Sequence, residues 1–216
     1  MPRNIEGLDS AGKRILELSR SAGSRILIGI VGKPGAGKST IASKLREILP
    51  QEETTILSQD GYHLSNAQLK ELGRSDRKGA PDTFDPISFT ELLKRVSTDL
   101  ENNIYFPIFH REIEESISAE GVITSKTKIV LVEGNYLLLE SHGWHDVANH
   151  LNETWYLKID DGIRLKRLVA RHIEYGKDPD FAHSWAHGTD EANARLIEET
   201  KVRTHAFLAM SEDEQK

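Results

Sequence analysis

The sequence of 216 residues contains no cysteine, which excludes disulfide bonds, thiolate metal sites and cysteine nucleophiles together. Long apolar runs are also missing, because the longest is about the length of one strand and far too short to span a membrane. The first residues lack the apolar core of a secretory signal peptide. We therefore expect a cytoplasmic protein with no membrane partner.

Basic residues are outnumbered as well. The chain has 28 lysines and arginines against 34 aspartates and glutamates, which gives a net charge of −6. Because proteins that bind nucleic acid usually present a basic surface, we expect no nucleic-acid partner. The length suits one α/β domain covering residues 1–216, with a sizeable core.

The most informative stretch begins with the apolar run 26–31 and continues through residues 32–39, Gly-Lys-Pro-Gly-Ala-Gly-Lys-Ser. This octet matches the phosphate-loop (Walker A) pattern G-x-x-x-x-G-K-[ST]. Apolar residues, Ile41 and Leu45 among them, then recur at helical spacing until Pro50. Strand, loop and helix follow one another as the motif requires, so the sequence predicts a nucleoside-triphosphate site here.

Each residue type in this loop suits a triphosphate. Glycines let backbone N–H groups point at a phosphate, and the start of the helix adds partial positive charge. Lys38 would reach the outer phosphates, and the Ser39 hydroxyl would ligate Mg²⁺. The expected nucleotide contacts are Gly32, Lys33, Pro34, Gly35, Ala36, Gly37, Lys38, Ser39 and Thr40.

Hydrophobic periodicity divides the rest of the chain into alternating strands and helices. We expect further strands at 54–58, 128–134, 155–159 and 205–210, and helices at 8–22, 66–72, 85–102, 161–175 and 190–202. Residues 104–126 suit an irregular hairpin, and residues 177–189 a polar segment with a short helix. The alternation predicts a parallel sheet with helices on both faces, whose ligands lie beyond the carboxyl ends of the strands.

Two acids stand directly at such strand ends. Asp60 follows the strand at 54–58, where a carboxylate could accept a proton from an acceptor hydroxyl during phosphoryl transfer. Glu133 ends the apolar strand at 128–134, where an acid can hold a metal ion or its water. The alternatives are a turn-forming aspartate before glycine and a strand-terminal glutamate in solvent.

Two groups of basic residues are also candidates for binding anions. Arg164, Arg167 and Arg171 form a stripe on the helix at 161–175. Arg167 and Arg171 either clamp phosphates from a lid or are solvated, and Arg164 is expected at the surface. Arg74, Arg77 and Lys78 either bind an anionic group on the acceptor or keep a loop soluble.

Three further segments resemble the phosphoribulokinase/uridine kinase/pantothenate kinase group of P-loop kinases. They read Asp-Gly-Tyr-His-Leu at 60–64, Arg-Lys-Gly-Ala-Pro-Asp-Thr-Phe-Asp at 77–85 and Val-Glu-Gly-Asn-Tyr-Leu-Leu-Leu at 132–139. The segment from Arg171 through Gly176 to Trp185 is typical of the nucleoside/nucleotide kinase-like branch, also labelled fructose-transport-system kinase. The resemblance covers about residues 25–210.

The resemblance implies a P-loop NTPase fold in three layers, with five parallel strands in the order 2-3-1-4-5, counted from the strand at 26–31. It also implies ATP and Mg²⁺ as cofactors and a small-molecule hydroxyl acceptor. Relatives often form dimers, so a homodimer is expected. Residues 61–126 would form the acceptor-binding region and residues 172–189 the lid.

The resemblance also assigns roles to residues. The general base falls on Asp60, the metal-associated acid on Glu133, and the lid arginines on Arg167 and Arg171. The acceptor-side contacts fall on Tyr62, His63, Arg77, Lys78, Arg111 and Asn135. Many relatives have aspartate where this chain has His110, so sugar-kinase labels transfer weakly and the acceptor here is expected to differ.

The leading hypothesis is an ATP-dependent kinase that phosphorylates a hydroxyl of a sugar, nucleoside or pantothenate-like metabolite. One alternative is a nucleotide-binding switch that hydrolyses slowly and signals to a partner. No Asn-Lys-x-Asp guanine-reading sequence is present, and a switch has less need of an acceptor-side base such as Asp60. The other alternative is a nucleotide kinase whose acceptor is phosphorylated, which Arg74, Arg77 and Lys78 would allow.

Overall fold

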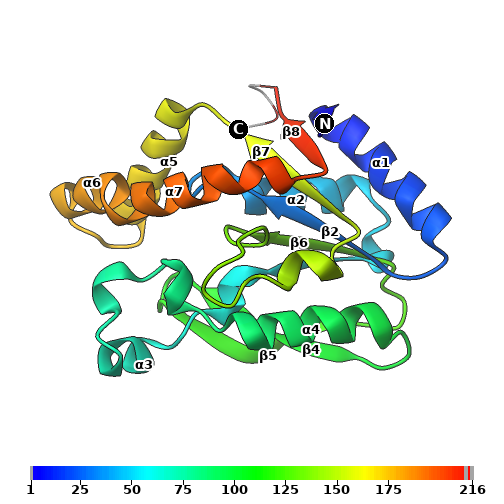
Figure 1. Ribbon diagram of the computed structural model, residues 1–216, viewed down its shortest axis with the longest axis horizontal. Coiled ribbons are helices and arrows are strands. Elements are labelled where there is room, and N and C mark those ends of the chain that lie inside the picture. Colours follow the sequence, from blue (N-terminus) through cyan, green and yellow to red (C-terminus); the bar gives the residue numbers. More distant parts are fainter. Residues whose placement is uncertain (1, 212–213, 215–216) are drawn as a thin grey trace.

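The computed structural model describes residues 2–211 and residue 214, and its centre is a sheet of six parallel strands (Figure 1). The order across the sheet is β1-β8-β7-β2-β6-β3. The strands are β1 (Arg3–Glu6), β2 (Ile26–Val31), β3 (Thr54–Ser58), β6 (Ile129–Gly134), β7 (Glu153–Lys158) and β8 (Ala206–Ala209). The five predicted strands are present in the predicted relative order.

The prediction of five strands was wrong by one, because β1 adds a sixth strand at the edge beside β8. This strand has four residues, and Ile5 is the one that is buried. Such a short polar segment carries no periodic signal of its own. Its pairing partner lies at the other end of the chain, so the strand is defined by a long-range contact.

Helices cover both faces of the sheet. The helices in the described part of the chain are α1 (Gly7–Ala22), α2 (Lys38–Ile48), α3 (Asn66–Glu71), α4 (Pro86–Thr98), α5 (Asp161–Glu174), α6 (Pro179–His187) and α7 (Thr189–Thr200). Alternate residues of β2 point to opposite faces, so Ile28 and Ile30 pack with α1 and α2. Leu27 and Val31 pack in the core that includes side chains of α4 and α7. Strands β2 and β6 are buried along their whole length, which is why they read as continuous apolar runs.

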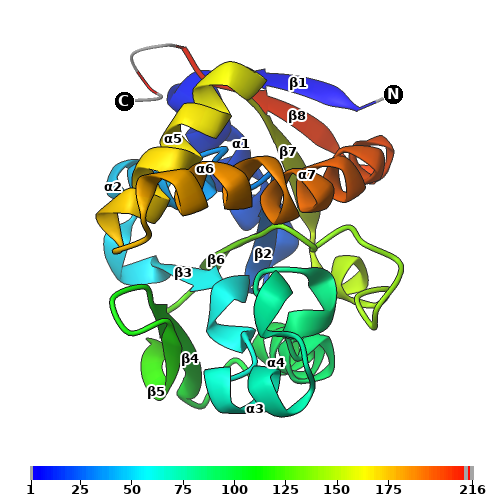
Figure 2. The same ribbon diagram turned by 90° about the vertical axis from the view of Figure 1, so that its left-hand side faces the viewer.

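A separate antiparallel hairpin, β4 (Ile104–His110) with β5 (Glu115–Ile123), lies beyond β3 (Figure 2). It is pressed against the 3₁₀ turn that follows β3, because a Cβ on Gly61 would stand 2.2 Å from the carbonyl oxygen of Pro107. Only glycine fits at this approach. The hairpin and α3 thus lie on one side of the strand ends, and α5–α7 lie on the other (Figures 1 and 2).

Candidate functional site

The loop at residues 32–37 connects the buried end of β2 to the first turn of α2. Gly35 and Gly37 have φ angles of +80° and +90°, which other residue types rarely adopt. A Cβ on Gly35 would also stand 2.7 Å from the carbonyl oxygen of Arg164. Both glycines are therefore needed for the backbone conformation, and Gly35 is also needed for the close packing of α5 on this loop.

Lys38 is buried at the start of α2. Its Nζ donates to the carbonyl oxygens of Gly32 at 3.0 Å and Lys33 at 3.3 Å, and to Asn135 Oδ1 at 2.6 Å. Burial lowers the pKa of Lys38 to about 8, although the Glu133 carboxylate opposes this shift. All three bonded oxygens are uncharged, so a phosphate group would supply the direct anionic partner that these bonds do not.

Ser39 and Thr40 are exposed at the helix start, and both line a cavity of about 660 Å³. Glu133 lies across from them at the end of β6, buried, and accepts a hydrogen bond from Ser58 Oγ at 2.5 Å. Burial and the nearby Asp60 carboxylate raise the pKa of Glu133 above its ordinary value. A divalent cation would offset this accumulation of negative charge.

Hydroxyl and carboxylate oxygens are the donors that Mg²⁺ prefers, so Ser39 and Glu133 fit this ion. No cluster of three or more acidic or histidine side chains suited to a metal occurs among residues 2–211 and 214. Mg²⁺ typically keeps several waters and takes its remaining ligands from substrate phosphates. Two protein oxygens beside a phosphate loop are therefore enough for a metal that arrives with a nucleotide.

Asp60 lies in the 3₁₀ turn Gln59–Tyr62, directly after β3. Its Oδ2 accepts a hydrogen bond from Arg111 Nη2 of the hairpin at 2.9 Å. Burial alone would raise the pKa of Asp60, but nearby basic groups, His63 when it is protonated and the permanent cation of Arg111, hold it below its usual value. Asp60 and Glu133 are thus neighbouring carboxyl groups with pKa values displaced in opposite directions, a pattern that often separates catalytic roles.

His63 lies between two aromatic rings, with centroid distances of 4.0 Å to Phe84 and 4.6 Å to Phe109. Its Nδ1 is 2.8 Å from the backbone carbonyl oxygen of Asp60. A carbonyl can only accept, so Nδ1 carries the proton and Nε2 is a hydrogen-bond acceptor. Burial lowers the pKa of His63, which favours this neutral form.

The other predicted acceptor-side residues are divided between the cavity and its surroundings. Lys78 and Asn135 line the cavity, and Lys78 Nζ bonds to Asn66 Oδ1 at 2.7 Å. Arg77 instead pairs with Asp82, its Nη2 standing 2.9 Å from Oδ2. Tyr62 packs edge-on against Phe89, with ring centroids 5.1 Å apart.

Arg77 and Tyr62 are absent from the cavity lining. His110, where the family resemblance leads us to expect aspartate, is also outside it and pairs with Glu120 at 2.6 Å. The lining on the acceptor side consists chiefly of Asp60, His63, Lys78, Phe84, Phe109 and Arg111.

Helix α5 places its three arginines in different surroundings. Arg171 lines the cavity, where burial and the neighbouring Arg111 lower the pKa of its guanidinium. Arg167 lies over the phosphate loop, with Nη1 3.6 Å from where a Cβ on Gly37 would stand. The expectation that Arg164 lies at the surface was wrong, since this side chain is fully buried.

Two features of the site had no signal in the sequence. The Lys33 side chain is absent from the cavity lining, and its ammonium instead pairs with Asp161 at 2.6 Å. A partly buried pair, His172 Nε2 with Asp190 Oδ2 at 2.7 Å, joins α5 to α7 at the cavity wall. Lys33 and Asp161 are far apart in the sequence, and the second pair depends on how α5 and α7 pack against each other.

No helix in the described part of the chain is long and apolar enough to cross a membrane. The sequence model of the Phosphoribulokinase / Uridine kinase family matches residues 27–214. A protein of Schizosaccharomyces pombe named "Putative uridine kinase" is 30% identical over 184 residues, covering 80% of this chain and 77% of that one. A uridine kinase of Clostridium novyi is 32% identical over 151 residues, covering 69% of each chain.

The fold also matches a solved structure described as a "putative fructose transport system kinase" from Silicibacter sp. TM1040. That match has a TM-score of 0.83 and 31% identity, and it covers 94% of this chain and 98% of the other. The relatives are named as kinases, in agreement with a phosphate loop and an acceptor-side carboxylate that face one cavity. The chain thus belongs to the phosphoribulokinase/uridine kinase family of P-loop kinases, nucleotide-dependent phosphotransferases with a hydroxyl acceptor on a small molecule.

Proposed function

We propose that this kinase transfers the γ-phosphoryl group of Mg-ATP to a hydroxyl of a sugar, nucleoside or pantothenate-like metabolite, with Asp60 as the general base. The observation that carries the proposal is the position of the Asp60 carboxylate. It shares one cavity with Lys38, Arg111 holds it in place, and its pKa is below the usual range. A carboxylate that stays ionised beside a phosphate-binding lysine can accept a proton from a bound alcohol.

In this mechanism the protein mainly positions the reactants and stabilises charge. The backbone of residues 32–40 and the Lys38 ammonium bind the phosphates, and Arg167 and Arg171 neutralise charge from α5. Bound Mg²⁺, held by Ser39 and Glu133, would withdraw charge from the phosphate oxygens.

Asp60 orients the acceptor hydroxyl and takes its proton as the new bond forms from the hydroxyl oxygen to the γ-phosphorus. The bond from the γ-phosphorus to the bridging oxygen breaks, and ADP leaves with that oxygen. Residues 61–126 would provide the acceptor side of the site. Residues 172–189, which include α6, would act as the lid that excludes water.

The acceptor side suits a molecule with a planar or apolar part and hydroxyl groups. Phe84 and Phe109 flank His63, whose Nε2 can accept a hydrogen bond from such a hydroxyl. Lys78 is the member of the basic loop at 74–78 that lines the cavity, where its Nζ is 3.3 Å from Glu114 Oε2. A phosphorylated acceptor would compete with Glu114 for Lys78, whereas Arg77 pairs with Asp82 outside the cavity.

The test is ADP release with Mg-ATP across a panel of sugars, nucleosides, pantothenate and their phosphates. Asp60→Asn removes the proposed base, and Asp82→Asn is the matched control because it makes the same change outside the cavity. We expect one class of acceptor to stimulate turnover, with the stimulation lost in Asp60→Asn and kept in Asp82→Asn. A nucleotide switch would instead show no stimulation by any metabolite and an unchanged basal rate in Asp60→Asn.

A cytoplasmic location and a homodimer stay predictions from the sequence. Cell fractionation and analytical ultracentrifugation test them directly.

A further inference from the structure

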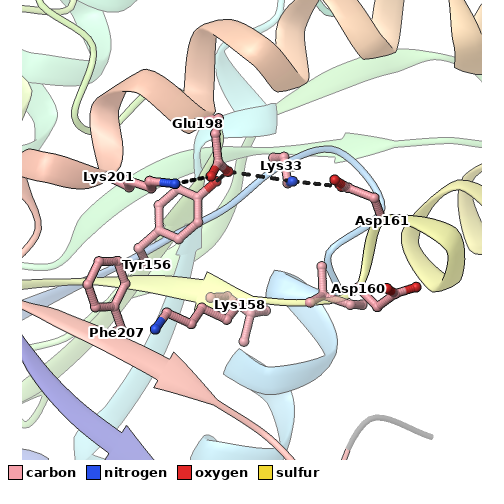
Figure 3. A pocket seen from close by; sticks show the side chains of 10 residues that line it. Lys33, Tyr156, Lys158, Asp160, Asp161, Glu198, Lys201 and Phe207 are labelled. Atoms are coloured by element: carbon pink, nitrogen blue, oxygen red, sulfur yellow. Dashed lines mark hydrogen bonds and ion pairs between the residues drawn. The ribbon is translucent and has the colours of Figure 1, made fainter.

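A network of charged side chains, here called the charged network, contacts the phosphate loop and is absent from the lining of the 660 Å³ cavity. Lys33 Nζ is 2.6 Å from Asp161 Oδ1 and 3.5 Å from Glu198 Oε2. Figure 3 shows Lys33 between these two acids, which come from the start of α5 and the last turns of α7. Glu198 also pairs with Lys201 and accepts a hydrogen bond from the Tyr156 hydroxyl at 2.7 Å.

The charged network also includes Arg164, whose side chain is fully buried. Its Nε donates to Asp161 Oδ1 at 2.8 Å, and its Nη2 donates to Glu191 Oε2 at 2.5 Å. Its Nη1 is 3.4 Å from the carbonyl oxygen of Pro34. Glu191 belongs to the first turn of α7 and Glu198 lies near its end. The charged network therefore extends along α7 and joins this helix to α5 and to the phosphate loop.

Two residues of the phosphate loop, Lys33 and Pro34, are therefore bonded to side chains of the charged network. The carbonyl oxygen of Lys33 accepts from Lys38 Nζ and from the backbone N–H of Ala36. A shift of the Lys33 side chain would move this carbonyl and with it an anchor of the Lys38 ammonium. The charged network can therefore affect the position of the Lys38 ammonium through the backbone of Lys33.

The same region contains a cavity of about 610 Å³. Its charged lining consists of three lysines and three acids, Lys33, Lys158, Lys201, Asp160, Asp161 and Glu198. A lining with balanced charges selects neither an anion nor a cation, and the contacts drawn in Figure 3 connect the lining residues to one another. The charges in this region are thus arranged to hold protein segments together.

We infer that Lys33 and Arg164 are positioning residues that hold the phosphate loop in its nucleotide-binding shape and join it to α5 and α7. These are the two helices that flank the proposed lid, so the loop and the base of the lid behave as one unit. The inference rests on nucleotide binding at the phosphate loop, as proposed above. It assigns to Lys33 a role for its side chain that is separate from any contact of its backbone with phosphate.

The two residues differ in how safely they can be changed. Removing the guanidinium of Arg164 would leave Asp161 and Glu191 without their buried partner, and changes of this kind can prevent folding. The Lys33 side chain is 12% exposed and borders the open cavity, so methionine can replace it without stranding a deeply buried charge. Lys33→Met is therefore the informative variant.

Lys201→Met is its matched control. Lys201 is a second lysine that pairs with Glu198, but it belongs to the turn after α7 and makes no bond to the phosphate loop. The measurements are the nucleotide Kd by fluorescence titration, the Tm, and the KM values for ATP and for the acceptor. We expect Lys33→Met to raise the nucleotide Kd and the KM for ATP about tenfold, because it loses pairs with two acids, and to leave the acceptor KM unchanged. Lys201→Met should stay within about twofold of the wild type.

A purely structural role would give a different pattern. It would lower the Tm in Lys33→Met while the nucleotide Kd stayed at the wild-type value, and this result would overturn the inference. An equal rise of the nucleotide Kd in Lys33→Met and Lys201→Met would overturn it as well. Both lysines pair with Glu198, so such a result would come from the loss of a Glu198 partner and not from the position of the loop.

Glu198→Gln provides a second route if Lys33→Met does not fold. This variant removes the ion pair between the Lys33 ammonium and the partly exposed Glu198 carboxylate of α7. We expect the nucleotide Kd to rise about threefold. An unchanged nucleotide Kd in Glu198→Gln would then overturn the inference. A wild-type protein that binds no nucleotide would defeat the proposed function and this inference together, whereas binding that is equal in wild type and variants would defeat the inference alone.

Discussion

Residues 32–40 and residues 60–111 line the same cavity, but the turn of the first segment is encoded in its own glycines, although α5 and α7 also contact it, whereas the second segment depends on distant contacts for its shape. The phosphate loop lies between β2 and α2, and its glycines have the φ angles that the turn needs. Asp60 is held by Arg111 of the hairpin, which is 51 residues away. The backbone turn of the nucleotide side is thus encoded by a local motif, whereas the acceptor side is formed by segments that are far apart in the sequence.

This difference separates the specificity for the nucleotide from the specificity for the acceptor. A local motif gives the same phosphate site in any chain that carries it, so the nucleotide side sets the chemistry common to the family. The acceptor side depends on how the hairpin and the loop at 74–85 pack around His63. Changes of acceptor can therefore arise there without loss of nucleotide binding.

The largest effect should come from the acceptor side, with Asp60→Asn. An amide cannot take the proton of the acceptor hydroxyl, so we expect kcat to fall by about 10²–10⁴-fold. The nucleotide Kd should stay within about twofold, because Lys38 makes no direct bond to Asp60. Steady-state kinetics with the stimulating acceptor and a nucleotide titration measure both quantities. A loss of nucleotide binding equal to the loss of kcat would contradict the separation of the two sides.

Lys38→Met should weaken nucleotide binding. Loss of a charge-assisted contact worth about 1.5–3 kcal/mol predicts a nucleotide Kd about 10–150-fold weaker. Lys44→Met is the matched control, since Lys44 lies on the same helix and bonds to the carbonyl oxygen of Glu214 outside the cavity. Fluorescence titration of both variants gives the comparison. Equal losses in the two variants would show a general effect of charge on α2.

Arg111→Met should sharpen the comparison, because it changes the acceptor side without removing the base. We expect about a tenfold loss in kcat/KM for the acceptor as Asp60 loses the donor that holds it. Arg111 also helps to keep the pKa of Asp60 low, so its removal raises that pKa and moves the acidic limb of the pH–rate profile upward. Arg77→Met, whose guanidinium lies outside the cavity, should leave the profile in place.

The smallest effect concerns the pH dependence of nucleotide binding. Burial sets the pKa of Lys38 at about 8 in the free protein, and a bound phosphate would raise it. Affinity is then full below this value and declines as the pH rises through it, by about twofold between about pH 7 and about pH 8. Titrations across this range measure the decline, which should vanish in Lys38→Met. A decline that persists in that variant would assign the proton to another group.

The sequence alone was sufficient where structure is local. The phosphate loop and the helix after it follow from a motif, glycine positions and periodicity. The relative order of five strands was also correct, but that order came from the family resemblance.

The sequence failed where partners are distant. Arg164 has the helical spacing of a surface stripe, and its burial is possible because Asp161 and Glu191 neutralise it from two helices. The pairing of Arg111 with Asp60, the side-chain direction of Lys33 and the edge strand β1 all depend on the packing of segments far apart in the chain. Residue type and spacing cannot encode such contacts.

The most direct test of the two-sided site is the nucleotide Kd of Asp60→Asn and Lys38→Met, measured side by side with acceptor-stimulated turnover. The account predicts that both variants lose turnover, but that Asp60→Asn binds nucleotide like the wild type while Lys38→Met binds it at least about tenfold more weakly. If the two variants bind nucleotide equally, whether well or poorly, the division of the cavity into a phosphate side and an acceptor side is contradicted.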